Sequence, residues 1–172
     1  MTQREAIFKS FSIDSAKDAF SYEESTGNLL RAKSVSNSKS GDASGYLRKD
    51  GYIVVRFGGR QTLAHRIIWA IYYGELPSRF IDHVNGDRSD NRIVNLRLAS
   101  RSENNQNATI RKDNKTGFKG VRWVERDKRF VASIRVNGKY KSLGYFIDAE
   151  SASAAYQQKA KELHGEFHYE QR

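Results

Sequence analysis

The sequence contains no cysteine, a single proline and a single methionine in 172 residues, and it has no long apolar run. Without cysteine the chain forms neither a disulfide framework nor a thiolate zinc site, so a bound metal has to rest on other ligands. No apolar stretch approaches the roughly 20 residues that a membrane-spanning helix needs, and no apolar block of a secretory signal follows the first residues. We therefore expect a cytoplasmic protein with no membrane partner.

Acidic residues are scarce relative to basic ones. The chain has 30 Lys and Arg against 20 Asp and Glu, a formal net charge of +10 and a sequence pI near 9.8. A chain this basic typically has an acidic polymer as its partner, which indicates nucleic acid. The length allows one ordinary domain or two small ones joined by a short linker, and the second arrangement fits the patterns below better.

The N-terminal part has β character. Residues 1–19 are polar with scattered apolar positions and predict a tail or short helix without a mechanism. From Phe20 the alternation predicts a small sheet, with strands at 20–22, 29–30 and 46–57. The loop between them, residues 33–45, is rich in Ser, Gly and Asn and is expected to be mobile and solvated. Residues 65–73 predict a helix that ends at Gly74.

The most informative segment is IDHVNGDRSDNRIVNLRLASRSENNQN, residues 81–107. It contains Asp82 and His83, then Asn95, then Asn104 nine positions further on. A carboxylate, an imidazole and two carboxamides suit phosphodiester hydrolysis, which needs oxygen ligands for a hard divalent cation, a base for water and struts that hold the loop. The pattern predicts a metal-dependent nuclease site.

The local structure expected here is strand, turn, strand and helix. Residues 79–83 predict the first strand, 84–87 a turn and 96–99 the second strand, while Ser100 to Glu103 has the spacing of a capping box that opens a helix. Successive side chains of a regular strand point to opposite faces. Asp82 and His83 therefore reach the same phosphate only where the strand frays into the turn, and we predict that geometry.

Residues 65–107 resemble HNH homing endonucleases of the phage and intron-encoded kind. The resemblance implies a ββα-metal (His-Me finger) core of two short strands, a helix and one metal ion. In that family a His-Arg pair often opens the preceding helix, and here it is His65 and Arg66. Two interpretations of His65 stay open, a structural one and a contact with substrate.

The roles follow from residue chemistry and agree with the resemblance. Asp82 is the expected metal ligand, and Asn104 completes the site for a divalent cation, Mg²⁺ before Mn²⁺. Asn105 competes with Asn104 for this role. His83 is the expected general base, because a neutral imidazole at pH 7 accepts a proton from water. Asn95 is expected to position His83 by bonding the backbone of the loop between the strands.

Three other polar residues of that loop, Asp87, Asp90 and Asn91, are assigned to turn chemistry and solvent. Each short fragment of the motif is common by itself. Only the combination of residue types at this spacing, with a capping box placing the last of them on a helix, supports a nuclease.

Past Asn107 the composition changes. Residues 111–147 hold eleven Lys or Arg against three acidic residues, a local net charge of +8, and residues 148–172 carry a net charge of −2. The basic part predicts strands near 120–124, 130–136 and 140–146, with Asn137-Gly138 as a hairpin turn. The rest predicts a helix capped by Asp148 and ended by Gly165. Its inner stripe comprises Ala149, Ala152, Ala155, Tyr156, Ala160 and Leu163.

A helix on one face leaves the other face of this sheet basic, which indicates a DNA-reading surface. The segments TGFKGVRW, RFVASIRVNGKYKSLGYF and DAESASAAYQQKAKELHG, within residues 115–167, resemble the plant Apetala/ethylene-response-factor DNA-binding domain, which lays a three-stranded sheet in the major groove. Ser133 and Ser142 stand where plant domains usually have Glu and Trp, so the plant site preference does not transfer.

A two-residue turn pairs Arg135 with Tyr140 and Ser133 with Ser142. Arg122, Arg135 and Tyr140 are therefore the candidates for base contacts. For Trp123 we favour core packing over base stacking. Residues expected at phosphates are Lys119, Arg126, Lys128, Arg129 and Lys139, with a solvated side chain as the alternative for Arg129.

The sequence thus predicts an α+β protein, with a tail at 1–19, a nuclease domain with its N-terminal β region at 20–107, a linker at 108–114 and a DNA-binding domain at 115–172, a three-stranded antiparallel sheet packed on one α-helix. We expect a phage or mobile-element DNA endonuclease that nicks double-stranded DNA in the host cytoplasm, with no obligate protein partner evident. One rival is a catalytically silent DNA-binding regulator. An RNA-binding protein is disfavoured, because the aromatic consensus of common RNA-binding sheets is absent.

Overall fold

The computed structural model describes residues 11–108, 110, 113–136 and 138–168. The chain divides into two compact units, Met1–Asn104 and Asn105–Arg172. The division falls inside a helix, three residues before the end of the nuclease domain expected from the sequence. The predicted boundaries at 107 and 115 and the intervening linker stay proposals.

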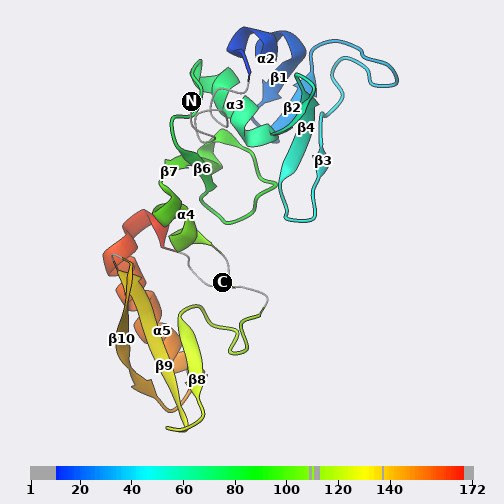
Figure 1. The fold of residues 1–172 in the computed structure, drawn as a ribbon. Coiled ribbons are helices and arrows are strands. Elements are labelled where there is room, and N and C mark those ends of the chain that lie inside the picture. The colour runs from blue at the N-terminus through cyan, green and yellow to red at the C-terminus, as the bar shows by residue number, and fades with distance from the viewer. Residues whose placement is uncertain (1–10, 109, 111–112, 137, 169–172) are drawn as a thin grey trace. The chain divides into compact units, whose positions relative to one another are not determined.

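The described part of the N-terminal unit begins with a short helix and a β-hairpin (Figure 1). Helix α2 (Ile13–Ala19) begins at Ser12, whose side chain accepts from the Ser15 N–H, and its only buried residue is Ala16. Residues 13–19 therefore form the short helix and not a tail. Residues 1–10 lie outside the described part. Strands β1 (Phe20–Glu23) and β2 (Asn28–Arg31) pair antiparallel, from Phe20 opposite Arg31 to Glu23 opposite Asn28.

A three-stranded sheet follows, in the order β3 (Tyr46–Leu47), β4 (Ile53–Phe57) and β5 (Arg60–Leu63). The continuous strand predicted for 46–57 is wrong, because the chain turns between β3 and β4. Gly51, with φ of 89°, occupies that turn, and the Gly51 N–H donates to the Arg48 carbonyl at 2.9 Å.

Helix α3 (Ala64–Tyr73) carries the core of this unit. It ends at Gly74 in the left-handed conformation, as the sequence predicts. Its apolar residues pack with those of β1, β2, β4 and the hairpin described next. The buried cluster comprises Ala16, Phe20, Leu29, Val55, Ala64, Ile67, Ile68, Trp69, Ile81, Ile93 and Leu96.

The last elements of the unit are a hairpin and a helix. Strands β6 (Phe80–His83) and β7 (Leu96–Ala99) pair antiparallel, and the 3₁₀ helix η1 (Ile93–Asn95) lies between them. Helix α4 (Arg101–Asn107) follows β7 and runs into the second unit. Its capping box is confirmed: the Ser100 N–H donates to Glu103 Oε2 at 2.6 Å, and the Glu103 N–H donates to Ser100 Oγ at 3.2 Å.

The C-terminal unit is a three-stranded antiparallel sheet in the order β10-β9-β8, packed on one helix (Figure 1). The elements are β8 (Val121–Val124), β9 (Arg129–Val136), β10 (Lys139–Phe146), α5 (Ala149–His164) and the 3₁₀ helix η2 (Gly165–Phe167). The predicted pairing of Arg135 with Tyr140 and of Ser133 with Ser142 is confirmed. The register shifts after Ser142, and position 137 of the predicted turn lies outside the described residues.

Helix α5 begins at Asp148, whose carboxylate accepts from the Ser151 N–H at 2.6 Å, and ends at Gly165, as predicted. Ala152, Tyr156 and Ala160 of its inner stripe are buried against the sheet. Leu163, by contrast, is exposed, so its assignment to the stripe is wrong.

The core assignment of Trp123 is also wrong, because this side chain is 42% exposed. Trp123 shares strand parity with buried Val121, but it lies next to the turn that joins β8 to β9. There its ring packs edge-on against Phe130, with centroids 4.8 Å apart, and its Nε1–H donates to Glu125 at 2.6 Å.

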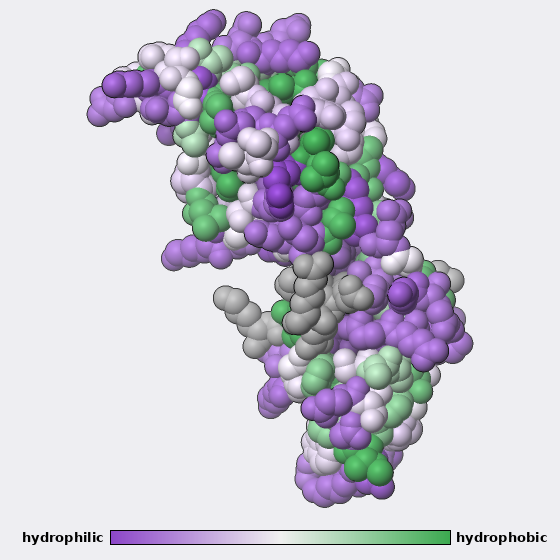
Figure 2. All heavy atoms as spheres, turned by 180° about the vertical axis from the view of Figure 1, so that it is seen from behind, coloured by the Kyte–Doolittle hydropathy of each residue, from purple (hydrophilic) through white to green (hydrophobic). Residues whose placement is uncertain are grey.

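The face drawn in Figure 2 is largely hydrophilic over each unit, with hydrophobic residues in small separate patches. Within the described ranges, no helix combines the length and the apolar character that crossing a membrane requires.

Candidate active site

Asp82 and His83 are the last two residues of β6, and both are buried, with 4% and 3% exposure. The ladder is regular to the end of the strand: Asp82 faces Arg97 and His83 faces Leu96 on β7. The predicted fraying is therefore wrong. The two side chains instead have separate immediate neighbours, and the electrostatic effect of the Asp82 carboxylate still reaches the His83 ring.

The Asp82 carboxylate pairs with Arg97. Arg97 donates to Asp82 Oδ2 from Nε at 3.0 Å and from Nη2 at 2.8 Å, and both side chains are mostly shielded from solvent. A buried carboxylate is costly without a compensating charge, and the guanidinium supplies that charge with a fixed geometry. Sequence reasoning assigned no role to Arg97. The cross-strand pairing that places it there is visible only once the hairpin register is known.

The His83 ring is held on several sides. Its Nε2 lies 3.0 Å from Asn91 Oδ1, and its ring centroid lies 5.1 Å from that of His65 and 5.9 Å from that of Tyr52. Burial lowers the pKa of His83 from its ordinary value, against the opposite effects of the Asn91 hydrogen bond and the Asp82 charge. A lowered pKa keeps the imidazole neutral near pH 7, the form that a general base requires.

His65, near the start of α3, is a neighbour of the His83 ring. Its side chain is buried, it packs edge-to-face on His83, and its Nδ1 has no hydrogen-bond partner among the described residues. Burial lowers the pKa of His65 well below its ordinary value, and the neighbouring His83 and Arg66 add to this. Burial favours a structural role for His65 over a contact with substrate.

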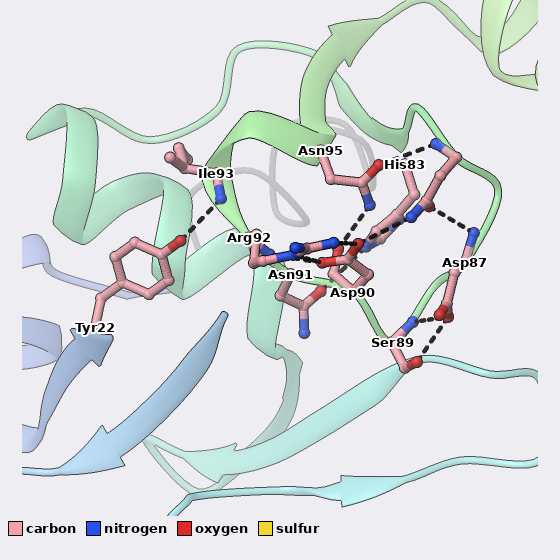
Figure 3. Close-up of polar contacts among 10 residues, drawn as sticks. Tyr22, His83, Asp87, Ser89, Asp90, Asn91, Arg92, Ile93 and Asn95 are labelled. Carbon is pink, nitrogen blue, oxygen red and sulfur yellow. Dashed lines mark hydrogen bonds and ion pairs between the residues drawn. The ribbon is translucent and has the colours of Figure 1, made fainter. Parts of the chain in front are cut away.

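The loop between β6 and β7 is folded by its own side chains (Figure 3). Asn95 accepts at Oδ1 from the Asn85 N–H at 2.9 Å and donates from Nδ2 to the Asp90 carbonyl at 2.8 Å. These are the backbone bonds expected of Asn95, so this residue ties both halves of the loop together. Its part in catalysis stays a prediction.

Asp87 and Asp90 behave as ordinary turn residues. Asp87 accepts from the backbone and hydroxyl of Ser89. Asp90 pairs with Arg92 at 2.7 Å and accepts from Asn85 Nδ2 at 2.9 Å, and the Arg92 guanidinium lowers the pKa of Asp90 to about 2.

Asn91 is not the solvated turn residue that the sequence predicts. It is 1% exposed and lies against the His83 ring, so placing it in solvent was wrong. No sequence signal separates it from its polar neighbours, because its burial depends on how the loop folds back over β6. Tyr22 of β1 contributes to that fold: its hydroxyl accepts from the Ile93 N–H at 2.8 Å (Figure 3).

Asn104 lies in α4 and is half-buried, whereas its competitor Asn105 is exposed. No group of three or more His, Cys, Asp or Glu suited to a metal occurs in the described part of the chain. The donors predicted from the sequence are one carboxylate, Asp82, whose Oδ2 accepts from Arg97, and one carboxamide, Asn104. Such a set suits Mg²⁺, which favours oxygen and keeps several waters among its ligands.

The candidates for base contacts lie on the face of the second sheet opposite α5. Arg122 is exposed on β8, and Tyr140 on β10 is 77% exposed. Arg135 on β9 lies 5.7 Å from the Tyr140 ring centroid and donates from Nε to the Gly138 carbonyl at 3.0 Å. The contact fixes an arginine and an aromatic ring side by side at the end of the sheet.

The three lysines expected at phosphates differ from one another. Lys139 is exposed. Lys128 is exposed too, and its ammonium pairs with Glu125. Lys119 is mostly buried and donates to the carbonyls of Gln106 and Ala108, and burial lowers its pKa to about 8. This placement does not favour a phosphate contact for Lys119.

The hairpin with its polar loop, the buried Asp82 and His83 and the capped helix follow one another within residues 80–107. A family profile described as HNH endonuclease matches residues 62–106, which span α3, β6, β7 and most of α4. Residues 62–106 therefore form an HNH endonuclease family domain.

Two curated viral proteins are similar to it. "Uncharacterized HNH endonuclease L560" of Acanthamoeba polyphaga mimivirus is 35% identical over 124 residues, 71% of this chain and 63% of that protein. "Protein 3.8" of Escherichia phage T7 is 30% identical over 104 residues, 60% of this chain and 85% of that protein. The chain thus spans less than two thirds of the mimivirus protein. A search of solved structures gave no match.

Proposed function

We propose that this protein is a divalent-metal-dependent DNA endonuclease that hydrolyses phosphodiester bonds. The observation that carries the proposal is the buried His83 ring, which Asn91 holds within the segment that matches the family. Burial lowers the pKa of this imidazole and keeps it neutral near pH 7, which suits a base that acts on water.

Hydrolysis joins a water oxygen to phosphorus, breaks one P–O bond of the backbone and releases the leaving oxygen. In this scheme His83 takes the proton of the attacking water, a role typically worth about 10²–10⁴ in rate. Asn95 keeps the loop closed around the ring through its bonds to Asn85 and Asp90. Arg97 holds the orientation of the Asp82 carboxylate.

Asp82 and Asn104 are the residues that would hold the metal, Mg²⁺ before Mn²⁺. When bound, the ion neutralises charge on the phosphate and on the leaving oxygen. Their oxygen donors fit a hard cation, and the remaining coordination positions belong to water and phosphate.

The C-terminal unit is proposed to target the nuclease to double-stranded DNA, in the manner of an Apetala/ethylene-response-factor-like domain. Support comes from the net charge of residues 111–147 and from the exposed Arg122, Arg135 and Tyr140 opposite α5. One proposed metal site per chain favours nicking over double-strand cutting. A homing-type enzyme of phage or mobile-element origin, acting in the host cytoplasm, fits this description.

The test is Mg²⁺-dependent nicking of supercoiled DNA, with DNA binding measured on the same samples. His83→Gln is the informative variant, because its amide N–H₂ can still donate to Asn91 Oδ1 while the base is lost. His168→Gln, in the C-terminal unit, is the matched control. We expect cleavage by the wild type and the control, and binding without cleavage by His83→Gln.

The rival function is a sequence-specific DNA-binding regulator that has lost cleavage. It requires tight binding by the wild type with no nicking in either Mg²⁺ or Mn²⁺. That result would replace the nuclease proposal with the regulator.

A further inference from the structure

We propose that Asn91 is a positioning residue that fixes the tautomer and the rotation of the His83 ring, so that the lone pair that accepts the proton of water is on Nδ1. The inference rests on the proposed function, in which His83 is the base. It adds which ring nitrogen acts and which residue selects it.

The hydrogen bond between His83 and Asn91 determines which ring nitrogen carries the proton. Asn91 Oδ1 lies 3.0 Å from His83 Nε2. A carboxamide oxygen only accepts, so this bond requires a proton on Nε2. A neutral imidazole carries a single N–H, and its other nitrogen then holds the lone pair. The Asn91 bond therefore assigns the basic lone pair to Nδ1.

Both partners of this hydrogen bond are buried. Asn91 is 1% exposed and His83 is 3% exposed, so neither group can exchange the bond for one with bulk water. A buried polar group that loses its partner is left with an uncompensated cost of desolvation. Flipping the ring, or moving the proton to Nδ1, breaks the bond and incurs this cost.

Aromatic side chains pack around the His83 ring. His65 meets it edge-to-face at 5.1 Å, and Tyr52 lies at 5.9 Å. Tyr52 is itself covered by Arg88, whose guanidinium carbon lies 4.9 Å from the ring centroid and whose Nη1 donates to the Asp50 carbonyl at 2.9 Å. The aromatic contacts restrict ring rotation, and the polar bond selects one of the remaining orientations.

Asn91 is in turn held from a distant part of the sequence. At Gly27, in the β1–β2 turn, an added Cβ would lie 2.6 Å from the Arg92 nitrogen and 2.9 Å from the Asn91 carbonyl carbon. The turn therefore packs directly on the backbone of Asn91. The Tyr22 hydroxyl, which accepts from the Ile93 N–H, holds the next part of the same loop. The N-terminal hairpin thus supports the residue that orients the base.

The test reads the tautomer directly, from the imidazole nitrogen signals of His83 in long-range ¹H–¹⁵N spectra of the full chain. The wild type should show a protonated Nε2 and an unprotonated Nδ1. Asn91→Leu, which keeps the volume and removes the acceptor, should give mixed tautomers. Asn91→Asp retains an acceptor oxygen and should retain the wild-type tautomer.

Kinetics supply the second readout. Asn91→Leu should lower kcat by roughly tenfold or more with KM little changed, because the loss of a partner that sets a catalytic histidine's tautomer costs up to about 10⁴ in another hydrolase. Ile93→Ala removes a buried apolar side chain from the same loop and controls for lost stability. It should destabilise the unit and leave the His83 tautomer as in the wild type.

The proposal is overturned if wild-type His83 carries its proton on Nδ1, or if Asn91→Leu changes neither the tautomer nor kcat. A tautomer change in Ile93→Ala equal to that in Asn91→Leu would also overturn it, by assigning the effect to general loosening. The imidazole nitrogen spectra of His83 can be recorded whether or not the protein cleaves DNA. A wild type that binds DNA without cutting would refute the proposed function and leave the result on the imidazole standing.

Discussion

A buried imidazole whose Nδ1 has no hydrogen-bond partner among the described residues makes the N-terminal unit sensitive to acid. Burial holds the pKa of His65 well below its ordinary value of 6.5. As the pH falls through about 6.5, the unfolded chain gains a proton at this residue and the folded chain does not. The free energy of unfolding is therefore largest above this pH and decreases on acidification, by about 1.4 kcal/mol for each unit of pKa depression.

We predict that His65→Phe, which keeps an aromatic ring at this position, flattens the pH dependence of unfolding between pH 6.5 and more acidic values. Urea titrations in a Trp123→Phe background leave Trp69 as the single tryptophan and report on the N-terminal unit. His168→Phe, in the other unit, should preserve the wild-type slope. A slope unchanged by His65→Phe would mean that the pKa of His65 is the same in the folded and the unfolded chain.

At the scale of elements, the contact of β8 with α5 depends on one glycine. Gly120 has φ of +74°, and an added Cβ would lie 2.1 Å from the Tyr156 ring. Gly117 has the same φ, but an added Cβ there meets nothing within 4 Å. Comparing substitutions at Gly120 and Gly117 separates the cost of backbone strain from the cost of steric overlap, because only Gly120 combines the two.

We predict that Gly120→Ala destabilises the C-terminal unit by several kcal/mol more than Gly117→Ala, whose cost is the left-handed backbone, about 1 kcal/mol. Hydrogen exchange of the β9 amides in the full chain measures both. Equal effects of the two substitutions would show that the Tyr156 ring moves aside without cost.

Elements were predicted from sequence where the signal is local. The capping box at Ser100, the Gly74 stop and the pairing of Arg135 with Tyr140 each follow from a few adjacent residues, and each is confirmed. Features that join distant segments were not predictable. The burial of Asn91 depends on the loop folding back, and the regular end of β6 depends on its pairing with β7.

For the whole molecule, the charge is concentrated where the proposed function needs it, in residues 111–147. Each phosphate neutralised by a lysine or arginine contributes about 0.9 to the slope of log affinity against log salt concentration. The number of lysines on the sheet does not give the number of contacts, however, because their ammonium groups have different surroundings. The salt slope therefore tests the assignment of each lysine separately.

We predict that Lys139→Ala lowers the magnitude of this slope by about 1, because an exposed ammonium contributes a full phosphate contact. Lys128→Ala should have a smaller effect, since its ammonium already pairs with Glu125. Lys119→Ala should leave the slope unchanged, because this ammonium donates to the carbonyls of Gln106 and Ala108. Binding to one duplex over a range of salt concentrations, without metal so that no strand is cut, measures all three. A drop of about 1 for Lys119→Ala would instead mean that Lys119 leaves its carbonyl partners for a phosphate when DNA binds.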